Sequence, residues 1–218
     1  LIFICSLLSM VHAQERNCGS FLKASLKNGE KLSGYLSKRL VFEKEAARSK
    51  TTGQLVIDFR INRLGRIDSI NVIEFPHESL AKQAVDVLLT TKNSWQATTC
   101  DSSTIDHVYK IVIEYVWKSG DEKYVDPVVR IKKKVDKAMK KEAYQKAMEW
   151  INSAIALDEY DPSLFRRRAK IFERLDDSAS AKTDIETSKR LKNMLLIKKL
   201  LITGYTTIRR VEVSRTRF

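Results

Sequence analysis

The periodicity of apolar residues changes once along the chain, and this change constrains the fold more than any other feature of the sequence. Between residues 19 and 117, several short runs alternate apolar and polar residues, which is typical of half-buried β-strands. From Pro127 onward the alternation stops, glycine is absent as far as residue 203, and apolar residues recur with helical spacing. We therefore expect an α+β domain over residues 19–117, a polar linker over residues 118–126 and an all-α segment over residues 127–203.

Three strands are predicted in the first domain. Residues 54–62 alternate cleanly, with Phe59 among the apolar side chains on one face. Gly65 then supplies the positive φ that a tight hairpin requires, and residues 66–75 form the returning strand. The third strand covers residues 108–117. Together these strands predict a small three-stranded antiparallel sheet.

Two helices are predicted beside this sheet. The first covers residues 31–48 and turns Leu36, Leu40 and Ala47 inward. The second has Ser79 as its N-cap and carries an apolar stripe. Helices packed on one face of a small sheet give an α+β layer architecture.

Short motifs after residue 34 follow one another in the order and at the spacing of a known domain. The matching segments are Gly34-Tyr35-Leu36, residues 42–46, the strand 53–59, the turn Gly65-Arg66-Ile67, the strand Ile70-Asn71-Val72, the helix 80–88 and Trp95. In this order they resemble the C-terminal domain of the energy transducer TonB. Glu43 and Ala97 stand where that family has prolines.

This resemblance implies a way of binding a partner. In the TonB family, the closing strand pairs its open edge with an extended peptide of an outer-membrane receptor, which is β-augmentation. The corresponding strand here covers residues 108–116, so the implied partner is a TonB-dependent receptor. The alternative is that this strand lies inside the sheet. The positions that would line the edge are Val108, Lys110, Val112, Glu114 and Val116.

Apolar or small residues recur 34 positions apart in the all-α segment. The pairs are Ile131 and Phe165, Val135 and Ala169, Ala138 and Phe172, Ala147 and Ala181, Ile151 and Ile185, Ala154 and Ser188, and Leu157 and Leu191. This period resembles tetratricopeptide (TPR) repeats, in which each repeat is a pair of antiparallel helices. The resemblance implies close helix crossings at the small residues Ala147, Ala154, Ala169 and Ala181. A plain four-helix segment is the alternative.

The C-terminal region is strongly basic. From residue 189 to the end, nine Lys or Arg residues accompany a single acid, Glu212, in a chain whose net charge is +13. We expect residues 195–202 to form a helix that caps the repeats, and residues 204–218 to form a basic tail that is strand-like or disordered. Contact with an acidic membrane surface is the alternative to a solvated tail.

The N-terminus predicts export. Residues 1–10 are an apolar run that is too short to span a bilayer but suits the core of a signal peptide, so residues 1–13 are expected to be cleaved after Ala13. Because the chain begins at Leu1 without a basic region, we expect some N-terminal residues to be missing. The predicted location is the periplasm. An uncleaved inner-membrane anchor and a buried N-terminal helix are the alternatives.

Two cysteines remain after signal cleavage. Cys5 leaves with the signal, whereas Cys18 and Cys100 stay in the mature chain, where an oxidising compartment would permit them to pair. Two unpaired thiols are the alternative, because neither cysteine lies in a recognisable disulfide or metal motif.

The sequence suggests no catalytic, metal or cofactor site. His77 and His107 have no second ligand at metal spacing, and none of the common nucleophile or phosphate-binding motifs occurs. Asp106 and His107 are adjacent, but neighbouring residues on a strand point to opposite faces. We therefore expect a binding protein rather than an enzyme.

The predicted function is that of a periplasmic adaptor related to TonB-dependent transport, which binds a partner peptide by β-augmentation. The alternative is a TPR-type scaffold for a protein partner in the cell envelope, with the TonB-like domain serving a structural role. A protein at the membrane surface is a third hypothesis. A homodimer formed by strand exchange would be compatible with a small sheet, and nucleic acid is not expected as a partner outside the cytoplasm.

Overall fold

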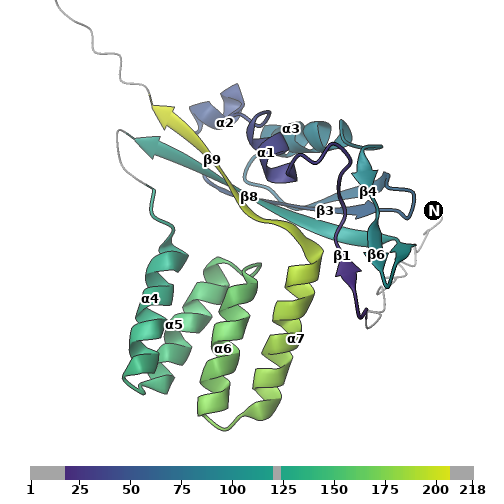
Figure 1. Ribbon diagram of the computed structural model, residues 1–218. Coiled ribbons are helices and arrows are strands. Elements are labelled where there is room, and N and C mark those ends of the chain that lie inside the picture. Colours follow the sequence, from purple (N-terminus) through teal and green to yellow (C-terminus); the bar gives the residue numbers. More distant parts are fainter. Residues whose placement is uncertain (1–17, 120–123, 207–218) are drawn as a thin grey trace, which may run out of the picture.

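The computed structural model describes residues 18–119 and 124–206. The predicted signal peptide, residues 1–13, and residues 207–218 of the predicted tail lie outside the described residues. Within the described residues the chain has a mixed α/β fold, and its main sheet has the strand order β4-β3-β8-β9 (Figure 1). No helix in these ranges is long and apolar enough to cross a membrane.

The three predicted strands form the antiparallel part of the main sheet. They are β3 (Gly53–Ile61), β4 (Ile67–Glu74) and β8 (His107–Ser119). β3 lies in the middle, so Phe59 is opposite Ile70 on one side and Tyr109 on the other. Gly65 has a φ of 71° in the hairpin between β3 and β4, as expected for a tight turn.

A fourth strand, which the sequence did not predict, completes the sheet. β9 (Leu195–Thr206) pairs in parallel with β8, and Ile202 is opposite Tyr115. The prediction of a capping helix over residues 195–202 was therefore wrong. Ile197 and Ile202 of β9 join the main core, whereas Lys198 and Lys199 pair with carboxylates at the ends of the crossover helices. The strand therefore has no clean alternation of apolar and polar residues, and such a run is hard to distinguish from a buried helix by periodicity alone.

This strand makes the helical segment an insertion in the sheet rather than a separate C-terminal domain. Parallel neighbours require a crossover connection, and four helices form the crossover between β8 and β9. They are α4 (Pro127–Lys140), α5 (Tyr144–Leu157), α6 (Pro162–Arg174) and α7 (Ser178–Met194). The helices end at Met194, so the predicted boundary at residue 203 was wrong, and residues 204–206 belong to the sheet rather than to a tail.

Aspartate side chains begin three of these helices. The carboxylates of Asp126, Asp161 and Asp177 accept backbone N–H groups of the first turn at 2.8, 2.9 and 3.0 Å, respectively. Pro127 and Pro162 follow two of these caps at the first helical position, where no backbone N–H is needed. α4 begins at Pro127, where the helical segment was expected to begin, and Asp126 at the end of the predicted linker is its N-cap. At the other end, residues 118 and 119 of the predicted linker belong to β8. Residues 120–123 of the linker lie outside the described residues.

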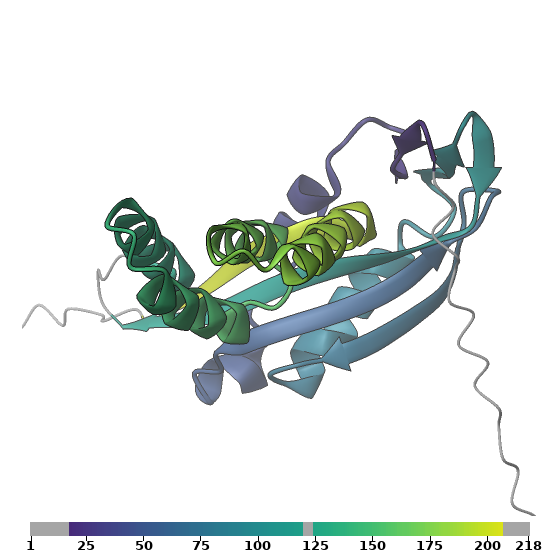
Figure 2. The ribbon, with the colours of Figure 1, turned by 90° about the horizontal axis from the view of Figure 1, so that it is seen from below.

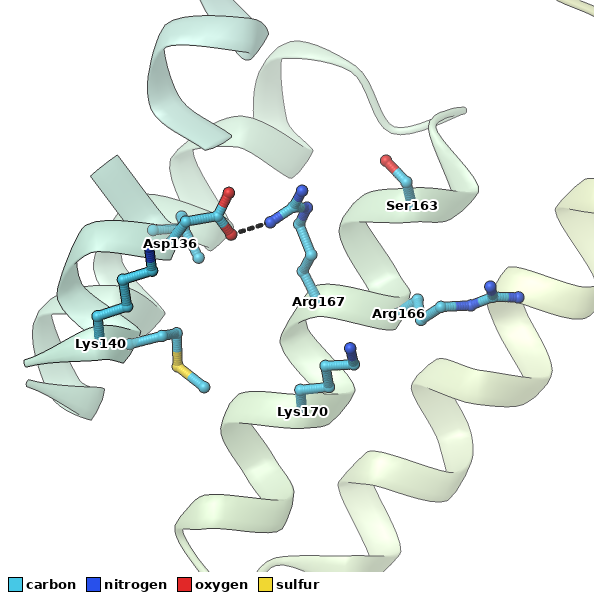
Figure 3. Close-up of a pocket in the computed structure, with 8 residues that line it drawn as sticks. Asp136, Lys140, Ser163, Arg166, Arg167 and Lys170 are labelled. Carbon is cyan, nitrogen blue, oxygen red and sulfur yellow. Dashed lines mark hydrogen bonds and ion pairs between the residues drawn. The ribbon is translucent and has the colours of Figure 1, made fainter. Parts of the chain in front are cut away.

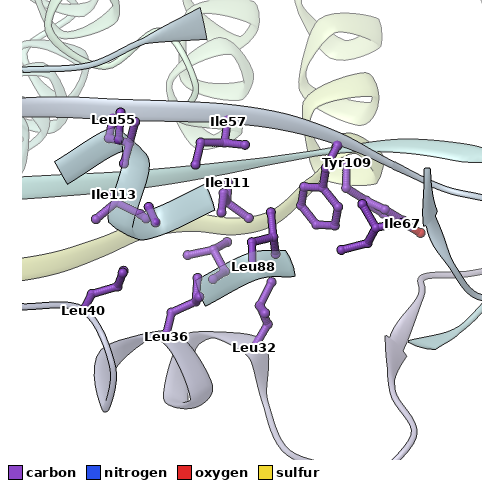
Figure 4. Packing of buried hydrophobic residues seen from close by; sticks show 14 of the residues in the cluster. Leu32, Leu36, Leu40, Leu55, Ile57, Ile67, Leu88, Tyr109, Ile111 and Ile113 are labelled. Atoms are coloured by element: carbon purple, nitrogen blue, oxygen red, sulfur yellow. The ribbon is translucent and has the colours of Figure 1, made fainter. Parts of the chain in front are cut away.

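Helices cover both faces of the main sheet (Figure 2). One face carries α1 (Leu32–Ser37), α2 (Lys44–Arg48) and α3 (Glu78–Leu89), and the opposite face carries the crossover helices. The first face holds the main hydrophobic core, which includes Leu36, Leu55, Ile57, Leu88, Ile111 and Ile113 (Figure 4). The second face holds a smaller cluster, formed by Val56, Val112, Leu191 and Leu195 with Tyr160 and Phe165 packed against them.

The predicted helix over residues 31–48 is two short helices. Residues 38–43 separate α1 from α2, and Phe42 in this stretch packs edge-on against Tyr115 and Trp117. These tertiary contacts hold the chain in a non-helical path. Leu36 and Leu40 are buried as predicted, but the inward residue of α2 is Ala46 rather than Ala47.

The N-cap of α3 also differs from the prediction. His77 caps the helix, because its Nδ1 atom accepts the Ser79 backbone N–H at 3.2 Å. Ser79 is therefore inside the first turn. An imidazole acceptor is not among the common capping groups, which explains why the sequence favoured the serine.

Two small sheets lie beside the main sheet, and each includes a short strand from the start of the described chain. Their strands are β1 (Phe21–Leu22), β6 (Thr98–Cys100) and β7 (Ser103–Ile105) in one, and β2 (Ser25–Leu26) with β5 (Trp95–Gln96) in the other. A disulfide between Cys18 and Cys100 fastens the first described residue to this region.

Candidate functional site

A groove of about 570 Å³ lies between α4 and α6, which are the first helices of the two helix pairs in the crossover (Figure 3). We call it the α4–α6 groove. Residues four apart on α4, and three or four apart on α6, share the side of each helix that faces the other. The groove is lined by Val135, Asp136, Met139 and Lys140 of α4 and by Ser163, Arg166, Arg167 and Lys170 of α6.

Positive charge is concentrated on the two helices that form this groove. α4 contains six Lys or Arg residues and one acid, and α6 contains five and one. Their partners in each pair are different: α5 contains one basic and one acidic residue, and α7 contains four and two. The groove therefore lies in the most positively charged part of the crossover, and anions are the ligands that such a surface attracts.

Two ion pairs join α4 to α6 across the groove. Lys132 pairs with Asp161 at one end. Further along, Arg167 pairs with Asp136, as Figure 3 shows. Within residues 18–119 and 124–206, no carboxylate forms an ion pair with Lys140, Arg166 or Lys170. Arg166 lines the groove, but its guanidinium is directed toward α7 (Figure 3). Lys140 and Lys170 are therefore the groove cations that the described carboxylates do not neutralise, and Val135 and Met139 add apolar surface beside them.

Asp161 fixes the position of α6 at the end of the groove nearest the sheet. Its buried carboxylate pairs with Lys132 and, at 2.7 Å, with Lys198 of β9, and it also accepts the Ser163 N–H. Burial alone would raise the pKa of Asp161, but the hydrogen bonds from these three donors outweigh it and hold the pKa at about 2.

A second ionic cluster fastens the helices to the sheet. The Lys199 ammonium of β9 lies 3.1 Å from carboxylate oxygens of Glu114, Asp126 and Asp158. Burial opposes the charged form of Lys199, but the three carboxylates raise its pKa. Burial raises the pKa of Asp158 despite Lys199. Tyr124 donates a hydrogen bond of 2.6 Å to Glu114. This cluster is structural, because it connects β8, β9 and both ends of the first helix pair.

The structure corrects the predicted open edge of residues 108–116. From Lys110 onward β8 is paired with β3 on one side and with β9 on the other, so its backbone there is already occupied. Val108 pairs with Arg60 of β3 and precedes the stretch that pairs with β9. Val112 and Val116 are buried in the sheet, and Lys110 forms an ion pair of 2.5 Å with Asp58. The prediction failed because the chain returns to the sheet after the helices, which no local pattern in β8 reveals.

The small residues chosen for repeat packing all lie in the helix interfaces. Ala147, Ala154, Ala169 and Ala181 are buried. The predictions for cysteine left pairing open, and the structure joins Cys18 to Cys100. These two sulfur atoms and Asp101 form a group of three metal-type ligands, but the sulfurs are bonded to each other and are not thiolates.

His107 and Trp95 occupy structural positions. His107 packs edge-on against Phe21 and Tyr109, and burial lowers its pKa. Asp106 turns away from it and accepts the Arg63 backbone N–H at 2.7 Å. Trp95 is buried in β5 and donates a hydrogen bond to Thr91.

Sequence reasoning missed the groove residues, although a signal for them was present. The basic triplets Lys132-Lys133-Lys134 and Arg166-Arg167-Arg168 are 34 positions apart, the same spacing as the apolar pairs. The repeat therefore places charge as well as core residues.

Comparison of the chain with protein-family models, with curated proteins and with solved structures finds no match.

Proposed function

We propose that the protein is an exported adaptor that binds an acidic segment of a partner protein in the α4–α6 groove. The observation that carries this proposal is the pair of cationic side chains Lys140 and Lys170, which line a concave surface without a carboxylate partner among the described residues. Carboxylates of a partner would accept charge-assisted hydrogen bonds from these side chains and neutralise their charge.

The shape of the groove favours a peptide segment over a broad protein surface. Its volume of about 570 Å³ is typical of sites that hold a small ligand or a few side chains. Val135 and Met139 add apolar contact area beside the charges. An extended segment with acidic and apolar side chains would use both.

Several features support the finer fold assignment within this proposal. The consecutive pairs α4–α5 and α6–α7, with alanines at their crossings, support the TPR-like interpretation. The pairing of β4, β3 and β8 with α3 packed on them supports the TonB-like interpretation. Because β9 already occupies the edge of β8, the TonB-like domain is a support for the helices in this proposal, and a receptor peptide does not bind there.

The disulfide supports a location outside the reducing cytoplasm. Such bonds persist in oxidising compartments such as the periplasm, which agrees with the predicted signal peptide. Mass spectrometry of the protein from cells tests this part of the proposal. A mature chain beginning at Gln14 supports export, and a chain that keeps residues 1–13 contradicts cleavage.

The binding experiment uses a fluorescein-labelled peptide that alternates Glu with Ala, and a control peptide with Gln in place of Glu. Fluorescence anisotropy measures the affinity of the full chain for each. We expect the Glu peptide to bind, the Gln peptide not to bind, and the affinity to fall as salt screens the charges.

A pair of matched variants locates the site. Lys140→Gln with Lys170→Gln removes two groove cations, and Lys182→Gln with Lys189→Gln removes two exposed cations of α7 outside the groove. The groove variant should weaken binding about three- to ten-fold, and the α7 variant should change it less than about two-fold. Equal losses in both variants, or no binding of the Glu peptide, would contradict the proposal.

A vesicle-binding assay distinguishes a protein ligand from a membrane surface as the partner of the groove. Flotation with phosphatidylcholine vesicles, with and without phosphatidylglycerol, measures binding to an anionic bilayer. Binding to the phosphatidylglycerol vesicles without binding to the Glu peptide would replace the adaptor by a protein of the membrane surface.

A further inference from the structure

The two ion pairs across the α4–α6 groove differ in how exposed they are. In the Lys132–Asp161 pair the two side chains are 20% and 1% exposed, whereas in the Arg167–Asp136 pair they are 35% and 50% exposed. Asp161 has two further partners, Lys198 and the Ser163 N–H. Asp136 has one ion-pair partner among the described residues, Arg167. The first pair is therefore fixed, and the second can exchange.

The charged side chains form three successive levels along the groove. Lys132, Asp136 and Lys140 are four residues apart on α4, so they are about 6 Å apart along the helix axis. The first level holds Lys132 with Asp161, the second holds Asp136 with Arg167, and the third holds Lys140 of α4 and Lys170 of α6. Figure 3 shows Asp136 and Arg167 pointing toward one another across the groove, with Lys170 further along α6.

An extended acidic segment matches the spacing of these levels. Side chains on the same side of an extended chain are about 7 Å apart. When one carboxylate of such a segment lies between Lys140 and Lys170, the next reaches the level of Arg167. Asp136 lies at that level on the groove side of α4, so its carboxylate and the second carboxylate of the segment compete for the guanidinium of Arg167.

We propose that Asp136 holds the place of a ligand carboxylate in the unoccupied groove, and that binding of the acidic segment exchanges the Asp136–Arg167 pair for a pair between Arg167 and the ligand. This inference rests on the proposed function and adds a built-in competitor to the same site. Asp136 would then make the groove selective. A segment with a single carboxylate can bind Lys140 and Lys170, but it has no second carboxylate with which to replace Asp136 as the partner of Arg167.

The exchange is feasible because both partners are partly solvated. Exposed ion pairs contribute little to stability, since water competes for both groups, and their rupture does not disturb the fold. Arg167 keeps its planar guanidinium directed into the groove, where a carboxylate can accept two of its N–H groups. Asp161 cannot play the same part, because its departure would leave Lys132 and Lys198 without their shared anion.

The test compares Asp136→Asn with the unaltered full chain, using the same Glu–Ala peptide and anisotropy. Removal of the competitor should tighten binding about three-fold. The matched control is Glu173→Gln, which removes one exposed carboxylate from α6 outside the groove and should leave the affinity unchanged within the error of the titration. A gain in affinity cannot arise from unfolding, so loss of structure does not mimic the expected result.

A double-mutant cycle separates direct competition from the general effect of a lost negative charge. In an Arg167→Gln background, Asp136→Asn should bring no gain, because the guanidinium for which the carboxylates compete is absent. Three results would overturn the inference even if the peptide binds. These are a gain in affinity that persists in the Arg167→Gln background, an equal gain in Glu173→Gln, and an unchanged affinity in Asp136→Asn. Absence of peptide binding in every variant would overturn the proposed function, and this inference with it.

Discussion

Lys198 of β9 and Asp161 at the start of α6 form an ion pair of 2.7 Å, which ties the last strand of the sheet to a helix that lines the α4–α6 groove. The same buried carboxylate pairs with Lys132 of α4 and caps α6 through the Ser163 N–H. One side chain therefore joins the groove to the sheet, and its removal should destabilise the contact between them.

Asp161→Asn should lower the free energy of unfolding by about 3–5 kcal/mol at neutral pH. The amide keeps the shape of the side chain but leaves two ammonium groups without their anion, and breaking a buried ion pair on one side has this cost. Urea unfolding followed by circular dichroism measures the change. Asp176→Asn, which alters an exposed carboxylate between α6 and α7, is the control and should be close to neutral. Equal stabilities of the two variants would contradict the central position of Asp161.

The stability of the protein should depend on pH through the same residue. The pKa of Asp161 is about 2 in the folded chain, below the ordinary value near 4 that it recovers on unfolding. Its ionised form therefore stabilises the fold above about pH 4, and a contribution of about 2 kcal/mol is lost as the pH falls toward 2. Urea titrations across this interval should show a steeper loss in the unaltered protein than in Asp161→Asn. Parallel losses would assign the acid sensitivity to other groups.

Lys199→Met should destabilise the protein by about 3 kcal/mol or more. Methionine fills the space of the lysine stem, but the substitution removes the cation that Glu114, Asp126 and Asp158 share. Asp158 is buried, so its carboxylate would have to take up a proton or draw in water. Thermal unfolding of this variant is compared with that of Lys189→Met on the exposed side of α7. Similar melting temperatures would show that the cluster does not hold the helices to the sheet.

The disulfide should contribute about 4 kcal/mol to the free energy of unfolding, since it closes a loop with a sequence separation of 82 residues. Cys18→Ser with Cys100→Ser should lose this stability, and a reducing agent should destabilise the unaltered protein but not the double variant. Urea unfolding with and without dithiothreitol measures both effects. An unaltered protein that is indifferent to the reductant would indicate that the cysteines are not paired in solution.

The sequence predicted those parts of the fold that local patterns determine. Clean alternation located β3, β4 and β8, and aspartate followed by proline marks the start of α4 and of α6. The partner of each strand depends on contacts between distant residues, and no local pattern reports them. For this reason β9 was read as a helix, and β8 as an edge. The apolar residues Ile197 and Ile202 become intelligible as strand residues only once their pairing with β8 is known.

The candidate site was harder to predict than the fold, because its residues are ordinary surface cations when each is considered alone. Arg167 and Asp136 are 31 residues apart and meet only when the first helices of the two pairs lie side by side. The 34-residue period relates these two helices, and their basic triplets, residues 132–134 and 166–168, share that spacing. The groove could therefore have been anticipated from the repeat, whereas the ion pair across it required the structure.

Gly204→Ala tests the packing of β9 against β8 at the end of the sheet that the sequence assigned to the tail. A Cβ atom at Gly204 would lie 2.4 Å from Cε3 of Trp117 and 3.0 Å from Cδ2 of Phe42, closer than side chains tolerate. The aromatic rings would have to move, and overpacking of this kind costs about 1–3 kcal/mol. Gly34→Ala is the matched control, because a Cβ atom there meets nothing within 4 Å and alanine favours the helical conformation of α1. Urea unfolding should thus rank Gly34→Ala at or above the unaltered protein and Gly204→Ala below it. The reverse order would mean that β9 does not run beneath Trp117, and that the sheet ends before this strand reaches residue 204.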